Sequence, residues 1–83
     1  METSIGVVTH YYNRIQVAVM KLSEPVFIND MVHFLGNTTD FYQKVFSLEI
    51  NHHKIQSAEG GAEVAIQVED VVRRGDEVFK VED

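Results

Sequence analysis

The side chains best suited to acid–base or metal chemistry in this sequence are its four histidines, His10, His33, His52 and His53. Cysteine is absent, so a metal site would have to combine imidazoles with carboxylates. His52 and His53 are consecutive, and on a strand they would point to opposite faces and could not chelate one ion together. His10 or His33 could join one of them across strands, but no spacing requires it. We therefore expect surface histidines, no metal ion and no cofactor.

Nucleophilic catalysis has no recognisable centre in the sequence. An attacking hydroxyl or thiol needs a neighbouring base that is itself held in position. The acidic pair at residues 69–70 lies in an expected turn, where carboxylates are normally solvated. We expect no enzymatic activity from this chain alone. The serines that lack any such motif around them are Ser4, Ser23, Ser47 and Ser57.

Basic residues alternate with apolar ones along the expected strands, and aromatic residues lie among them, a pattern that can bind RNA through phosphate contacts and base stacking. If Arg14, Lys44 and Lys54 met on one wall with His52, the local field would be positive. Thirteen acidic residues against seven basic ones give a net charge of −6, which disfavours binding to a polyphosphate. Alternatively, outward strand positions simply carry charge. The residues concerned are Arg14, Lys21, Lys44, Lys54, Tyr11, Tyr12, Phe41 and Tyr42.

Aromatic residues also raise the possibility of a protein interface. Tyr11, Tyr12, Phe27 and Phe79 are more aromatics than one small core needs, and exposed aromatics mark interfaces. Neighbouring strand positions cannot all point inward. At least one of Tyr11 and Tyr12, and one of Val78 and Phe79, should therefore face outward or lie at the rim.

Two similar turn-then-strand units indicate the fold that would position these side chains. Residues 26–32 (VFINDMV) and 72–78 (VRRGDEV) each begin with Val, carry Asn-Asp or Gly-Asp three and four positions on, and return to Val two residues later. Asn, Asp and Gly suit such corners because they tolerate left-handed backbone. Val32 and Phe34 then alternate with His33, which predicts one buried and one solvated strand face.

Further strand patterns precede, separate and follow these units. We expect Ile5, Val7, Thr9 and Tyr11 on one face of a first strand, and Ile15, Val17 and Val19 inward on a second strand over residues 14–22. A long strand over residues 41–50 would need a bulge near residues 46–47, and Val64, Ile66 and Val68 line another. No helical stripe occurs. The sequence thus predicts an all-β fold, a small closed barrel of six or seven antiparallel-type strands.

Length and composition fit a single domain over residues 1–83, with a core from about residue 5 to residue 81. No apolar run reaches membrane-spanning length, and Met1 is followed directly by polar residues. We expect a cytoplasmic protein with no membrane partner.

Four segments in order resemble the second, β-barrel domain of translation factors of the elongation factor Tu type. These are residues 5–12 (IGVVTHYY), 26–36 (VFINDMVHFLG), 45–50 (VFSLEI) and 71–78 (VVRRGDEV). The sequence is most similar to small stand-alone elongation-factor-like proteins and to the barrel at the carboxyl end of collagenase-like peptidases. The loop at residues 38–41 (TTDF) is shared with that closer group. The resemblance implies a translation-factor-like barrel.

The resemblance also implies where a ligand would bind. In elongation factors this domain forms part of the cleft for the aminoacylated end of transfer RNA, and the matching segment here is residues 49–54 (EINHHK). No G-x-x-x-x-G-K-S/T loop is present, so no nucleotide cofactor is expected. Glu63 falls near a further cleft position, with a different side chain. The candidate binding residues are Glu49, His52, His53, Lys54, Arg14, Lys44, Thr39, Asp40 and Phe41.

The leading expectation is therefore a non-catalytic binding module that contacts RNA or a ribonucleoprotein in translation or RNA metabolism. The alternative is a protein–protein interaction adaptor that supplies in trans the barrel that related peptidases carry fused. A positive wall including Lys54 would favour RNA. An apolar, aromatic-rimmed patch would favour a protein partner.

Overall fold

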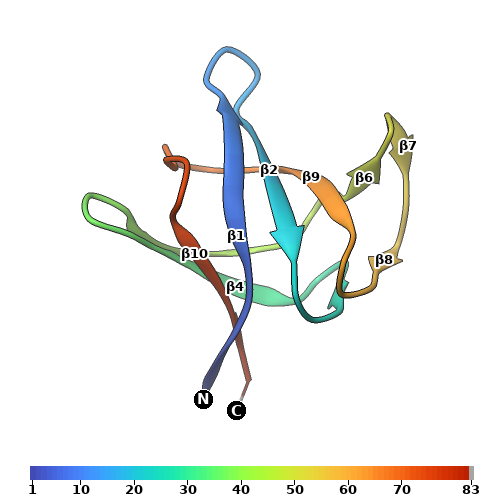
Figure 1. The fold of residues 1–83 in the computed structure, drawn as a ribbon, viewed down its shortest axis with the longest axis horizontal. Helices are drawn as coiled ribbons and strands as arrows, with labels where there is room; N and C mark the ends of the chain where they lie inside the picture. The colour runs from blue at the N-terminus through green and yellow to red at the C-terminus, as the bar shows by residue number, and fades with distance from the viewer. Residues whose placement is uncertain (83) are drawn as a thin grey trace.

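The computed structural model describes residues 1–82 and contains ten strands and no helix in that range (Figure 1). The all-β prediction is confirmed. Asp83, the last residue of the predicted domain, lies outside the described residues. The strands are β1 (Glu2–Tyr12), β2 (Val17–Leu22), β3 (Val26–Phe27), β4 (Met31–Leu35), β5 (Asp40–Lys44), β6 (Glu49–Ile50), β7 (His53–Lys54), β8 (Ser57–Ala58), β9 (Glu63–Gln67) and β10 (Glu77–Val81).

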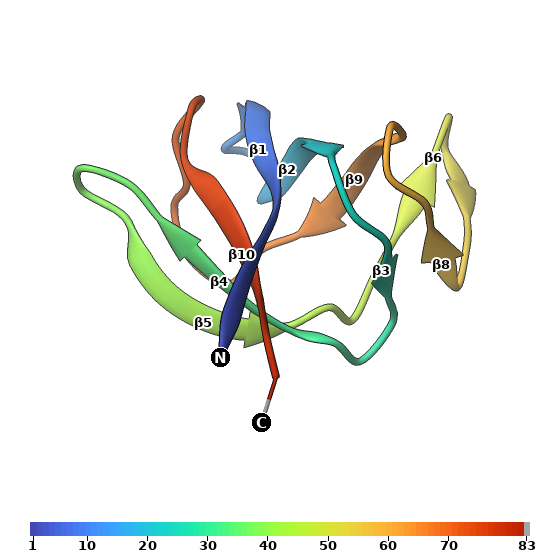
Figure 2. The same ribbon diagram turned by 60° about the horizontal axis from the view of Figure 1, so that its bottom comes forward.

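Eight of the strands form one antiparallel sheet in the order β5-β4-β10-β1-β2-β9-β6-β7, while β3 pairs with β8 separately. The sheet is strongly curved, so that its β4 and β5 strands lie below the other strands in the view of Figure 2. The order begins at β5 and ends at β7 without returning to its start, so backbone pairing closes no sheet within residues 1–82. Closure of the predicted six- or seven-stranded barrel is therefore not confirmed.

Side chains join the region of residues 43–47 to residues 67–69 at the end of β9, where backbone hydrogen bonds between strands would be needed to close a barrel. The Gln43 side chain donates to the Gln67 carbonyl at 3.0 Å and accepts from the Glu69 amide at 2.8 Å. The Gln67 amide donates to the Ser47 hydroxyl at 2.9 Å. The strand predicted over residues 41–50 is accordingly divided: β5 ends at Lys44 and β6 begins at Glu49, with no strand assigned between them.

The two predicted corners have the same geometry, as their sequences indicated. Asn29 and Gly75 both adopt left-handed backbone, with φ of 77° and 94°. In each corner the following aspartate accepts a hydrogen bond from the amide three residues earlier, which ties the turn together. The distances are 2.9 Å from Phe27 to Asp30 and 2.8 Å from Arg73 to Asp76.

The core consists of inward side chains from most strands. Val32 and Phe34 on β4, and Val64 and Ile66 on β9, are buried as predicted. His33 is a correction, because it is buried as well, although it lies on the outer face of β4. The remaining buried apolar residues are Ile5, Val8, Ala18, Met20, Leu22, Val26, Val45, Leu48, Ala58, Val68, Val72 and Val78.

The predicted inward face of the second strand is wrong. On β2 the buried residues are Ala18, Met20 and Leu22, whereas Val17 and Val19 are half-buried on the outer face. Ile15 precedes the strand and is 62% exposed. Residues 17–20 are all apolar, so their pattern has no phase, and only pairing with neighbouring strands decides which face is covered.

Strand β1 departs from simple alternation because its register shifts twice. The shifts fall between Ser4 and Gly6 and between Val8 and His10. Each extra residue reverses the side-chain phase. Ile5 and Val8 are therefore buried while Val7 faces outward, in place of the predicted continuous face.

Candidate functional site

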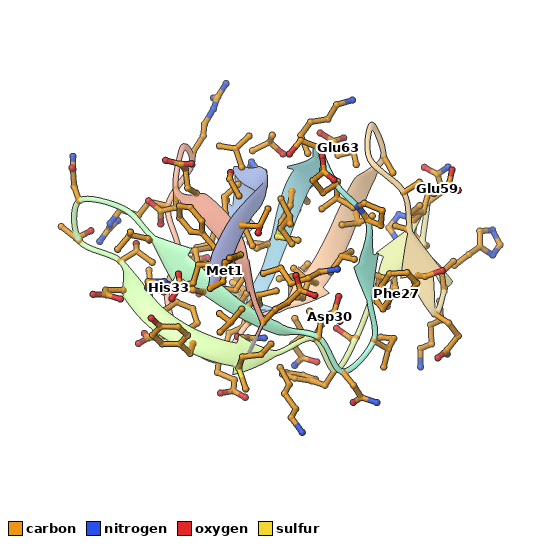
Figure 3. All side chains as sticks on the ribbon, turned by 90° about the horizontal axis from the view of Figure 1, so that it is seen from below. Met1, Phe27, Asp30, His33, Glu59 and Glu63 are labelled. Atoms are coloured by element: carbon orange, nitrogen blue, oxygen red, sulfur yellow. The ribbon has the colours of Figure 1, made fainter. Side chains whose placement is uncertain are left out.

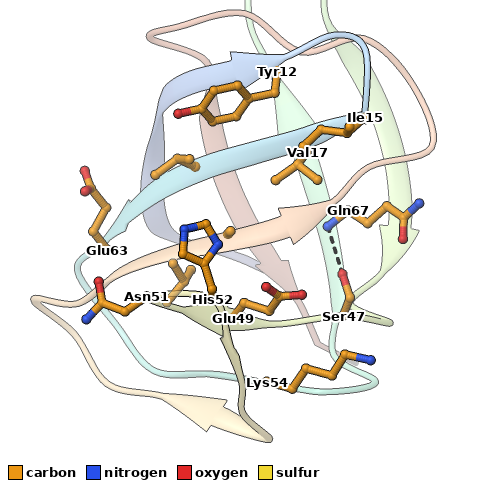
Figure 4. Close-up of a pocket in the computed structure, with 13 residues that line it drawn as sticks. Tyr12, Ile15, Val17, Ser47, Glu49, Asn51, His52, Lys54, Glu63 and Gln67 are labelled. Atoms are coloured by element: carbon orange, nitrogen blue, oxygen red, sulfur yellow. Dashed lines mark hydrogen bonds between the residues drawn. The ribbon is translucent and has the colours of Figure 1, made fainter.

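A groove of about 690 Å³ lies on the outer face of β2, β9 and β6 (Figure 4). Its lining comes from the β1–β2 connection, from the outward positions of β2 and β9, and from the β6–β7 hairpin. The lining residues are Tyr12, Ile15, Val17, Val19, Ser47, Glu49, Asn51, His52, Lys54, Glu63, Val64, Ala65 and Gln67.

The floor of the groove is apolar. Val17 and Val19 point outward from β2, and Ala65 is paired with Val19 on one side and with Glu49 of β6 on the other. Outward positions of an antiparallel sheet are usually polar where that face meets water. An apolar outer face is therefore a feature that folding of the core does not explain.

One end of the groove is formed by exposed apolar side chains. Tyr12 is 50% exposed and Ile15 is 62% exposed. They flank the turn between β1 and β2, where Gln16 has a positive φ of 56°. The Tyr12 ring packs against His10, with centroids 4.2 Å apart. The outward position of Tyr12 confirms the prediction for the Tyr11/Tyr12 pair, and buried Val78 beside half-buried Phe79 confirms the second.

The opposite wall is polar and comes from the β6–β7 hairpin. Asn51 and His52 form its tight turn, with φ of 51° and 66°. Glu49 and Lys54 are paired across the two strands. Glu63 lies at the far side of the groove, where it accepts a hydrogen bond of 3.4 Å from Thr9. Apart from His52, the groove thus contains two carboxylates and one ammonium group.

Only part of the predicted binding set comes together in this groove. Glu49, His52 and Lys54 line it, whereas His53, Arg14 and Lys44 do not. His53 is exposed on β7, and Arg14 is exposed in the turn before β2. Lys44 ends β5, at the opposite edge of the sheet from β7. The continuous positive wall considered above is therefore not assembled.

The loop residues of the predicted set have packing and hydrogen-bonding partners elsewhere. Thr39 is 4% exposed and its carbonyl accepts a hydrogen bond from the Gly36 amide. Asp40 contacts His33, and the Phe41 ring stacks on Phe34 with centroids 5.1 Å apart. These contacts hold the β4–β5 hairpin in place, and none of the three residues lines the groove.

The apolar part of the groove was missed by reasoning from the sequence. Val17, Val19 and Ala65 were assigned to the core or not singled out, and Ile15 was predicted to point inward. The sequence did indicate an apolar outer face, because residues 17–20 are all apolar, whereas one buried strand face needs an apolar residue only at every second position.

Within residues 1–82, no three His, Cys, Asp or Glu side chains lie where they could hold a metal ion together. None of the described segments forms a helix long and apolar enough to cross a membrane.

Two solved structures match the chain along nearly its whole length. Both are of the C-terminal domain of a protein assigned to the U32 peptidases, from Geobacillus thermoleovorans. The first has a TM-score of 0.89 and 17% identity, covering 94% of this chain and 91% of that domain. The second, a selenomethionine variant, has a TM-score of 0.87 and 16% identity, covering 92% and 96%. The fold is that of a U32 peptidase C-terminal domain.

One sequence relative supports the same connection. An uncharacterized protease of Methanocaldococcus jannaschii is 33% identical over 76 residues, which cover 90% of this chain and 19% of that protease. The chain therefore spans about a fifth of the length of this relative. No protein-family model matches the sequence. These findings bear out the expected likeness to a peptidase C-terminal domain, and they give no support to the expected link with elongation factor Tu.

Proposed function

We propose that this chain is a non-catalytic binding module associated with a peptidase of the U32 type, and that it contacts protein through the groove. The observation that carries this proposal is the apolar outer face of β2 and β9. Val17, Val19 and Ala65 lie there with the exposed side chains of Tyr12 and Ile15 at one end. Such a patch with a polar rim is typical of protein interfaces.

The partner we propose is the remainder of such a peptidase, outside the domain that this chain matches. The matched protease is about five times as long as the aligned region, so most of that relative lies outside it. The complementary surface would present apolar side chains to the floor and basic groups to Glu49 and Glu63. This corresponds to the adaptor alternative, in which the barrel-like domain acts in trans.

Binding of RNA is the weaker alternative on the same surface. His52, Lys54 and the Tyr12 ring would suit a nucleotide, but two carboxylates share the groove with them. The net charge of −6 adds a repulsive field for phosphates. The comparisons give no support for translation or RNA binding.

The test is isothermal titration of the chain with a U32-type peptidase from the same organism, produced without its own C-terminal domain. We expect a Kd of about 1 µM or tighter. Ile15→Asp, in the groove, should weaken binding about tenfold or more. Val71→Asp is the matched control, because Val71 is 49% exposed and does not line the groove. Equal loss in both variants, or no binding by the wild type, would contradict the proposal.

The RNA alternative is tested by a separate binding measurement. Fluorescence polarisation with a transfer-RNA acceptor-stem oligonucleotide should give no saturable binding at about 0.15 M salt. Salt-sensitive binding that Lys54→Glu abolishes would replace our proposal by the RNA function.

A further inference from the structure

His33 is buried on the outer face of β4, where an imidazole would ordinarily meet water. Its residue exposure is 7%, because neighbours on both sides cover it. The Tyr42 ring of β5 stacks on it with centroids 4.0 Å apart and an interplanar angle of 13°. Phe79 of β10 lies on the other side, with centroids 6.1 Å apart. Figure 3 labels His33 close to the N-terminal end of the chain.

Both ring nitrogens of His33 face carboxylates. Nδ1 lies 2.6 Å from Oε1 of Glu2, on β1, and Nε2 lies 2.6 Å from Oδ1 of Asp40, on β5. The Tyr42 hydroxyl donates to the second Glu2 oxygen at 2.8 Å. An ionised carboxylate only accepts, and a neutral imidazole has a single N–H. Both contacts can be hydrogen bonds together only when His33 carries a second proton.

The electrostatic surroundings favour that proton. Burial alone would lower the pKa of His33, but the hydrogen bonds and charges of Glu2 and Asp40 outweigh it and raise the pKa above its ordinary value. In turn, the hydrogen bond from His33, followed by that from Tyr42, lowers the pKa of Glu2.

Few other charged groups face His33. Glu77 of β10 is on the same face, two residues before Phe79, and accepts a hydrogen bond from Ser4 of β1. Lys44 of β5 is on that face two residues beyond Tyr42, opposite Met31. The N-terminal ammonium acts on Glu2. None of these groups takes the place of either carboxylate at the ring, so the close contacts with Glu2 and Asp40 dominate the electrostatic surroundings of His33.

We propose that Glu2, His33 and Asp40 form a pH-sensitive clasp that ties the start of β1 and the turn end of β5 to β4 and opens at Asp40 when His33 loses a proton. Asp40 is the side that opens because its side chain is 71% exposed, whereas that of Glu2 is 33% exposed and is also held by Tyr42. This inference is independent of the groove and of any partner bound there.

Opening at Asp40 would loosen the β4–β5 turn. Asp40 pairs with Leu35 at the start of the hairpin, and the turn between them is held by the Gly36 amide donating to the Thr39 carbonyl at 2.8 Å. The Arg73 side chain also reaches this turn, donating to the Thr38 hydroxyl at 3.0 Å. The clasp therefore couples protonation of one imidazole to the mobility of an exposed hairpin end.

The test is an NMR titration of the whole chain from about pH 5 to pH 9, a range chosen to span the ordinary titration of histidine. We expect the His33 ring signals to titrate above the ordinary value for histidine, because Glu2 and Asp40 both hold the doubly protonated ring. Exchange of the Gly36 amide, which donates to the Thr39 carbonyl, should accelerate over the same interval after correction for the intrinsic rate.

Two variants make the outcome decisive. Asp40→Asn should lower the titration midpoint of His33 and remove the pH-dependent step in amide exchange, while Glu59→Gln, at an exposed carboxylate far along the chain, should change neither. If Asp40→Asn does not fold, Glu2→Gln provides the same comparison at the other nitrogen. Titration of His33 at or below the ordinary value for histidine, or amide exchange at Gly36 that does not change with pH, would overturn the clasp.

Discussion

The side-chain amide of Gln43 donates to the backbone carbonyl of Gln67 at 3.0 Å, across the gap between β5 and the end of β9. Gln43 is only 3% exposed, and its oxygen accepts from the Glu69 amide at 2.8 Å. One side chain thus provides a donor and an acceptor to backbone groups, as a neighbouring strand would. It holds together the two regions of the curved sheet that no backbone ladder joins.

Replacing Gln43 should therefore destabilise the fold. Gln43→Leu keeps the approximate volume but leaves the Gln67 carbonyl and the Glu69 amide without their partner, so we expect the free energy of unfolding to fall by about 1–3 kcal/mol. Urea denaturation measures the change. Gln67→Ala is the matched control, because Gln67 contributes its backbone to this contact and should cost far less. Equal losses in the two variants would show that the Gln43 side chain has no special role.

The inward face of β2 can be tested by substitution at adjacent positions. Met20 is fully buried, so Met20→Ala should lower the free energy of unfolding by about 2–5 kcal/mol. Val19 lies on the groove floor, and Val19→Ala should cost clearly less. Thermal or urea unfolding of the two variants distinguishes them. A larger loss of unfolding free energy at Val19 than at Met20 would instead support the predicted inward face of Ile15, Val17 and Val19.

Gly36 is packed directly against the second corner. A Cβ at this position would lie 1.9 Å from Oδ1 of Asp76, whose other carboxylate oxygen holds the Arg73 amide. Gly36→Ala must displace that aspartate, and we expect a loss of about 1–3 kcal/mol in unfolding free energy. In the double variant with Asp76→Ala the two losses should not add, because they disrupt the same contact. Strict additivity in a double-mutant cycle would contradict this account.

Stability should depend on pH through His33 and Glu2 in opposite directions. Because the pKa of His33 is raised in the fold, its contribution is complete below the ordinary value of 6.5 and is lost as the pH rises through the folded pKa. The pKa of Glu2 is lowered, so its contribution is complete above 4.5 and is lost as the pH falls through the folded pKa. The two contributions are both present between these ordinary values.

Thermal unfolding at a series of pH values checks this dependence. The Tm of the wild type should fall as the pH rises above the ordinary pKa of histidine, while His33→Gln should show a flatter profile there. His53→Gln controls for loss of an exposed imidazole and should follow the wild type. If the Tm of His33→Gln changed with pH in parallel with that of the wild type, this imidazole would not be the cause of the loss of stability at high pH.

Local patterns alone predicted much of the scaffold. The absence of any helical stripe gave the all-β class, and the Asn29-Asp30 and Gly75-Asp76 pairs gave two corners with left-handed backbone and matching aspartate hydrogen bonds. Alternation identified Val32, Phe34, Val64 and Ile66 as core. These features follow from short-range rules, since a turn residue or a period of two acts within a few residues.

Only the tertiary structure decided which side of β1 and β2 is covered and what surrounds each polar side chain. The shifts in β1 and the uniformly apolar residues 17–20 leave the phase to strand pairing, so the outer apolar floor of the groove was not predictable from alternation. Likewise, Glu2 is distant in sequence from the β4–β5 hairpin that carries His33 and Asp40, and only the strand order β5-β4-β10-β1 brings it to them. The physical reason is that register and long-range pairing depend on the energy of the whole sheet, which no local window of sequence contains.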